Sequence, residues 1–164
     1  MNGDTAERIS QEGHGRKSES HELLEKASAF SRSILESIQA LAGTTTCKGV
    51  QIARLKDWAV KNNCWIENPN SLGNFVDRGS ENEVYMSKTD LKVYKLNDFR
   101  YSDDNLQPFF ERIIAHNLYF KDCAYDLIGF SINQSGKICA VLTQQVVTNA
   151  RLLHLKKSKK DWNN

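Results

Sequence analysis

The sequence predicts an α+β fold, in which an antiparallel sheet of about five strands packs against one helix and two further helices precede it. Two observations predict this fold. Apolar residues recur at helical spacing in the first third of the chain and again over residues 106–121. Between and after these stretches they form short, strand-length runs separated by turn residues. The length of 164 residues, with 40% apolar and 26% charged residues, fits one ordinary soluble domain.

The first 70 residues divide into a polar segment and a helical extension. Residues 1–20 contain almost no apolar anchors. Because such a segment cannot bury enough surface to offset its ordering entropy, we expect it to be disordered. The helical extension covers residues 21–70 and begins near Ser20, a residue that suits a helix N-cap.

Two helices are predicted in this extension. The first carries one apolar stripe, formed by Leu23, Ala27, Phe30, Ile34, Ile38 and Leu41. Such a stripe can pair with a second chain, but its short length favours packing against the chain's own domain. The second helix covers residues 48–62 and ends at Asn62 and Asn63, because asparagine tolerates the left-handed conformation.

Residues 71–150 form the predicted α+β domain. Short apolar runs at residues 75–76, 84–86 and 91–96 predict three strands. A helix follows from Leu106, and Pro108 suits its first turn, where no N–H donor is needed. Residues 125–132 and 137–147 predict two longer strands joined by a hairpin loop over residues 133–136.

The charge is unevenly distributed along the chain. The whole sequence has a formal net charge of +2, whereas residues 151–164 carry five basic residues and one acid. This basic C-terminal tail offers a nucleic-acid contact over residues 151–160. A solvated lysine run explains the same composition.

Several classes of protein are excluded by what the sequence lacks. The N-terminus has no apolar core of a signal peptide, and no run of about 20 apolar residues predicts a membrane helix. We therefore expect a cytoplasmic protein without membrane contact. The four cysteines form no Cys-x-x-Cys pair and the histidines are scattered. We expect structural thiols and no metal site.

One group of residues suggests phosphate chemistry. Gly79 lies in a turn that is followed by Val84 on one strand and Lys95 on the next. Glycine lets backbone amides approach a phosphate, and the lysine supplies a point charge. Glu111 on the following helix is a candidate to pair with Lys95, as in protein kinases. The same residues also fit a plain hairpin with surface charges.

An ordered set of motifs gives the sequence a family resemblance. The motifs are Gly79-Ser80-Glu81-x-x-Val84-Tyr85, Val93-Tyr94-Lys95, Phe110-Glu111-Arg112-Ile113-x-x-His116-Asn117, Tyr125-Asp126-Leu127-Ile128-Gly129-Phe130 and Val141-Leu142-x-Gln144-Gln145. In this order they resemble the N-terminal half of the polyvalent protein kinase family. These are kinase-like domains in proteins of bacterial mobile elements, particularly those of Bacteroides relatives. The resemblance covers about residues 72–147.

The resemblance implies a kinase small lobe and a role for each matching residue. Gly79 and Val84 would lie above a nucleotide, and Lys95 would contact its phosphates. Glu111 would be the helix partner of that lysine. The last matching residues, Gln144, Gln145 and Val146, would form the hinge that meets an adenine ring.

The same resemblance leads us to expect a protein that is not an enzyme. The sequence contains no His-Arg-Asp loop and no Asp-Phe-Gly motif, which supply the catalytic base and magnesium ligands of protein kinases. We therefore expect a non-catalytic interaction module, with a protein partner or a second copy of itself and no cofactor. One alternative is the ATP-binding half of a split or truncated kinase, and another is weak nucleic-acid binding through the tail.

Overall fold

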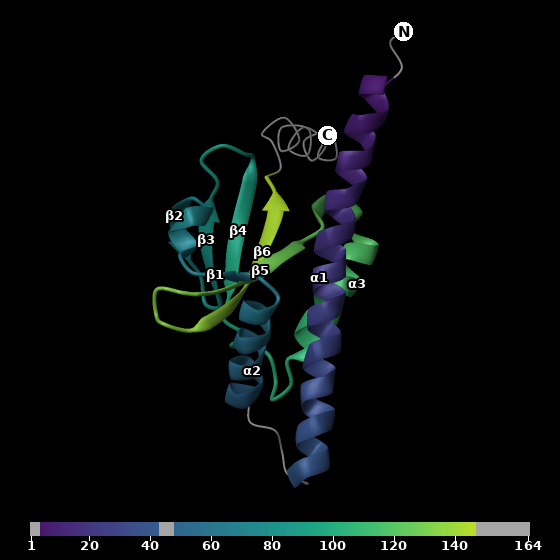
Figure 1. Cartoon of the computed structure of the whole chain (residues 1–164). Coiled ribbons are helices and arrows are strands. Elements are labelled where there is room, and N and C mark those ends of the chain that lie inside the picture. Colours follow the sequence, from purple (N-terminus) through teal and green to yellow (C-terminus); the bar gives the residue numbers. More distant parts are fainter. Residues whose placement is uncertain (1–3, 43–47, 147–164) are drawn as a thin grey trace, which may run out of the picture.

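A computed structural model describes residues 4–42 and 48–146 and confirms the α+β fold (Figure 1). The helices are α1 (Asp4–Ala42), α2 (Lys48–Lys61) and α3 (Gln107–Tyr119). The strands are β1 (Trp65–Ile66), β2 (Asn74–Arg78), β3 (Asn82–Met86), β4 (Lys92–Asn97), β5 (Asp126–Ile132) and β6 (Ile138–Gln145). They form one sheet in the order β1-β5-β6-β4-β3-β2. The basic tail, and with it the predicted nucleic-acid contact, lies outside the described residues.

Helix α1 begins at Asp4, whereas we expected residues 1–20 to be disordered. Extending an existing helix costs much less free energy than nucleating a new one. The part of α1 that packs on the domain, from Leu24 onward, can therefore continue toward the N-terminus as a polar helix. The packing prediction is confirmed, because Leu24, Ala27 and Ile34 are buried and α1 contacts α2, α3 and β5. Figure 1 shows α1 running alongside α3 and past α2.

Helix α2 ends where the asparagine pair predicts. Asn63 has a φ of 55°, and the Asn62 side chain donates to the Trp58 carbonyl. At its other end α2 fixes the loop that leads into α3. The buried Gln51 side chain accepts from the Leu106 amide at 3.1 Å, and the Lys48 ammonium donates to the Ser102 carbonyl at 2.6 Å.

The sheet contains one strand that the sequence analysis did not predict. Strand β1 pairs in parallel with β5, and the other pairs are antiparallel. Gly129 of β5 makes this pairing possible. It has a φ of 155°, and a Cβ atom at this position would overlap the carbonyl oxygen of Cys64. Any larger residue would therefore push the chain before β1 away from β5.

The two faces of the sheet carry separate apolar clusters. The helix-covered face holds the larger one, which includes Leu24, Ala27, Leu55, Ala59, Phe110, Leu127, Phe130, Ala140 and Leu142. The opposite face holds Tyr85, Leu96, Cys139 and Val141. All three helices contribute to the core on one face, and the candidate site opens on that same face.

Candidate functional site

A cleft of about 350 Å³ opens between β4 and α3 on the helix-covered face of the sheet. Lys95 reaches it from β4, and Arg112 and His116 reach it from α3. Leu142 of β6 lines the same cleft, and Glu81, before β3, brings one carboxylate. Because a lysine, an arginine and an imidazole line the cleft together with one carboxylate, the cleft suits an anionic ligand.

Lys95 sits on a central strand of the sheet. Its strand β4 pairs with β3 on one side and β6 on the other. Val84 lies directly opposite Lys95 in the β3–β4 ladder, so both half-buried side chains project from the same face. The Lys95 ammonium donates a hydrogen bond to the hydroxyl of Tyr125 at 3.0 Å. The structure thus brings together Val84 and Lys95, as the sequence predicts.

Glu111 does not join this group. Its exposed carboxylate accepts a hydrogen bond from the Gln107 side chain at 2.8 Å and lies 3.7 Å from the Arg32 guanidinium of α1. Within the described residues, no ion pair joins Glu111 to Lys95. The residues that α3 turns toward the cleft are Phe109, Arg112, Ile113 and His116. Glu111 belongs instead to the contact between α3 and α1.

The predicted hinge residues differ in their availability. The Val146 amide donates to the Leu91 carbonyl at 2.8 Å, so this N–H is already used within the sheet. The Gln144 side chain donates to the Cys123 carbonyl at 2.6 Å. In an antiparallel ladder, successive residues direct their backbone groups to alternate sides. The backbone N–H and C=O groups of the exposed Gln145 therefore point away from β4, toward the side of β5. The β5–β6 pairing begins at Asp126, opposite Thr143, so Gln145 lies past the end of β5.

Gly79 closes the β2–β3 turn by donating its amide to the Asn82 carbonyl at 2.8 Å. The turn lines a separate hollow of about 260 Å³. Its base is held by the buried carboxylate of Glu83, which accepts from the Arg78 guanidinium at 2.6 Å and from the Gln134 amide at 3.1 Å. These contacts tie the β2–β3 turn to the β5–β6 hairpin.

Sequence reasoning did not identify Tyr125, Arg112 or His116 as site residues. The apolar stripe of the predicted helix contained the signal for two of them. With about 100° between successive residues, Glu111 lies about 200° from the buried Ile113, on the outer side of the helix. Arg112 and His116 are four residues apart and flank the stripe, so helical geometry places them beside the cleft. Tyr125 begins one of the motifs that carry the family resemblance, but no local pattern assigns it a role in the site.

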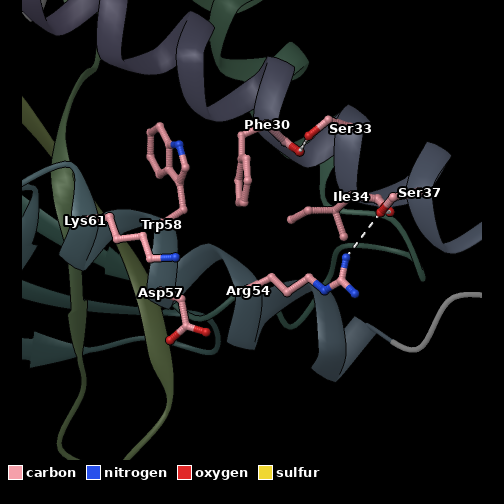
Figure 2. Close-up of a pocket in the computed structure, with 8 residues that line it drawn as sticks. All are labelled: Phe30, Ser33, Ile34, Ser37, Arg54, Asp57, Trp58 and Lys61. Carbon is pink, nitrogen blue, oxygen red and sulfur yellow. Dashed lines mark hydrogen bonds between the residues drawn. The ribbon is translucent and has the colours of Figure 1, made fainter.

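A second cavity, of about 480 Å³, lies between α1 and α2. Figure 2 shows the Phe30 and Trp58 rings side by side, with centroids 5.3 Å apart, and Arg54 reaching toward Ser37. Its walls are more apolar than those of the cleft at Lys95, and α3 and the central strands do not line it. The Phe30–Trp58 stack joins α1 to α2.

Two kinds of feature are absent from the described part of the chain. No cluster of three or more histidine, cysteine, aspartate or glutamate residues is placed to bind a metal ion. None of the helices described is both long enough and apolar enough to cross a membrane.

Comparison with known proteins identifies one family. The sequence model of the family described as "Serine/Threonine/Tyrosine Kinase found in polyvalent proteins" matches residues 48–162, which is more than half of the chain. The match begins at the first residue of α2 and includes the cleft. No curated protein and no solved structure matches the chain.

This match confirms the resemblance and corrects one expectation drawn from it. We expected a protein that is not an enzyme, because the sequence shows neither a His-Arg-Asp loop nor an Asp-Phe-Gly motif. That expectation is wrong, because the matching family is described as a kinase and so points to enzyme activity. As evidence about activity, the family match outweighs the absence of these two motifs.

Proposed function

The chain belongs to the family of serine/threonine/tyrosine kinases found in polyvalent proteins, and we propose that its cleft between β4 and α3 binds the phosphate groups of ATP. The observation that carries the proposal is the position of Lys95, whose ammonium enters the cleft from the central strand β4. Arg112 and His116 enter the same cleft from α3. Charge-assisted hydrogen bonds to phosphate are among the strongest polar contacts that proteins make.

The remaining residues give the nucleotide an orientation. Val84 lies beside Lys95 and provides an apolar wall. The outward-facing backbone of Gln145 is the hinge group that we assign to the adenine ring, since the Val146 amide is already bonded to Leu91. The phosphates would then lie toward α3, where the cations are. Because the described residues offer no cluster of metal ligands, we derive no magnesium-dependent step.

Isothermal titration calorimetry of the full chain with ATP tests this proposal. Lys95→Gln removes the charge from the cleft, and Lys88→Gln removes one from the exposed β3–β4 turn as a matched control. A hydrogen bond to a charged group contributes about 1.5–3 kcal/mol, so we expect Lys95→Gln to weaken ATP binding by about 10- to 100-fold. Lys88→Gln should leave it unchanged.

Adenosine separates the phosphate contacts from the base contacts. It lacks phosphates, so its affinity should be the same for the wild type and for Lys95→Gln. Equal ATP affinity of Lys95→Gln and Lys88→Gln would contradict the proposal, as would a full chain that binds no ATP.

A further inference from the structure

We propose that Tyr125 is the residue that positions Lys95, in the place where other protein kinases use a helix glutamate. This inference deepens the proposed function and rests on it. Lys95 donates to the Tyr125 hydroxyl at 3.0 Å, while its nitrogen lies 5.0 Å from the ring centroid. The ammonium therefore lies at the hydroxyl end of the ring, in hydrogen-bonding geometry.

Tyr125 is itself held firmly by the end of α3. The Asn117 side chain bonds both backbone groups of Tyr125, donating to its carbonyl at 2.7 Å and accepting from its amide at 2.8 Å. The His116 ring lies 5.1 Å from the Tyr125 ring, and its Nε2 lies 3.2 Å from the Cys123 carbonyl. Because these contacts fix the backbone and the ring, the hydroxyl presents a fixed acceptor to Lys95.

Glu111 is unable to take over this role without unpacking the helix. Glu111 neighbours Arg112, which lines the cleft, so bringing Glu111 there requires turning α3 by about 100°. Such a rotation would move Phe110 and Ile113, which are 0% and 8% exposed, out of the core. It would also break the contact of Glu111 with Arg32. The packing of α3 therefore excludes an acidic partner for Lys95 from this position.

A neutral partner changes what the lysine offers to a ligand. A carboxylate would cancel much of the charge of Lys95, whereas a tyrosine hydroxyl orients the ammonium and leaves its charge in place. Together with Arg112, this gives the cleft two cations for the phosphate groups. Tyr125 thus sets the position of Lys95, and Glu111 has no part in ATP binding.

The test compares Tyr125→Phe with Glu111→Gln in the full chain. Tyr125→Phe removes one oxygen and keeps the ring and the backbone contacts, so circular dichroism and the melting temperature should be unchanged. We expect it to weaken ATP binding by about three- to tenfold, the effect of losing one hydrogen bond. Glu111→Gln should bind ATP like the wild type. Equal losses in both variants, or no loss in Tyr125→Phe, would overturn the inference.

A second readout needs no ATP. Nuclear magnetic resonance of the full chain with ¹⁵N-labelled lysine reports how fast each ammonium exchanges its protons with water. The Lys95 signal should persist in the wild type and in Glu111→Gln, and it should be lost in Tyr125→Phe. If the chain binds no ATP, the proposed function fails while this signal still decides the lysine's partner. Loss of the signal in Glu111→Gln, or a wild-type Lys95 that exchanges as fast as the exposed Lys88, would overturn the inference.

Discussion

Replacing Phe130 tests whether the N-terminal helices and the sheet share one core. Phe130 of β5 is 0% exposed, and its ring meets Trp58 of α2 and Phe110 of α3, each with centroids 6.3 Å apart. Phe130→Ala removes both edge-to-face contacts and leaves a cavity between the sheet, α2 and α3. Buried Phe→Ala changes cost about 3–5 kcal/mol, and each ring pair adds about 0.5–1.5 kcal/mol to simple burial. We therefore expect a loss near the upper end, about 4–5 kcal/mol.

Urea unfolding, followed by circular dichroism and by tryptophan fluorescence, measures this loss. The two signals should give one midpoint, because a single core unfolds cooperatively. Phe130→Leu retains most of the apolar volume and should cost about 1–2 kcal/mol. Tyr119→Ala, at an 82% exposed position on α3, is the control and should cost less than about 0.5 kcal/mol. A loss below about 1 kcal/mol for Phe130→Ala, or two separate midpoints, would refute the shared core.

Three further predictions concern stability, each measured by urea unfolding. Glu83→Gln removes the charge that pairs with Arg78 and should cost about 1–2 kcal/mol; an unchanged midpoint would contradict this. Burial, with two nearby carboxylates, raises the pKa of the Cys139 thiol to about 12. Because a thiol in the unfolded chain ionises near 8.5, the unfolded state releases its proton first, and stability falls as the pH rises from about 9 to 12. Cys139→Ala removes this thiol, so its free energy of unfolding should fall less steeply with pH, by about 1.4 kcal/mol per pH unit. Identical slopes for the wild type and Cys139→Ala would refute the raised pKa of Cys139. Gly129→Ala forces a Cβ atom against the Cys64 carbonyl and should cost about 2–4 kcal/mol, whereas a cost near zero would show that β1 is not held against β5.

Most of the fold follows from local sequence signals. Helical spacing located α2 and α3 to within about two residues, and turn residues separated the strands that pair in the sheet. The asparagine pair at the end of α2 marked its left-handed cap correctly. Strand β1 was missed because Trp65 and Ile66 are too short a run to show alternation, and their pairing with β5 is a long-range contact.

The candidate site was less predictable. Val84 and Lys95 were recognisable because they lie on consecutive strands joined by a short turn, whereas the Gly79 turn lines a separate hollow. Tyr125 follows Lys95 by 30 positions, and only the packing of α3 brings its hydroxyl to the ammonium. Phe99 is a similar case: it has a φ of 58°, unusual for phenylalanine, and is fully buried against Phe109 and Phe110. Tertiary packing decides both positions, and no propensity scale reports it.

The proposed function requires that the phosphates of ATP bind beside Lys95 in this kinase-family chain. The most direct measurement is a map of the backbone amide shifts that ATP causes in the ¹⁵N-labelled full chain. We predict shifts that cluster at Val84, Lys95 and Arg112 and that need about 10- to 100-fold more ATP to appear in Lys95→Gln. No shift at millimolar ATP, or shifts confined to the cavity between α1 and α2 in Figure 2, would contradict it.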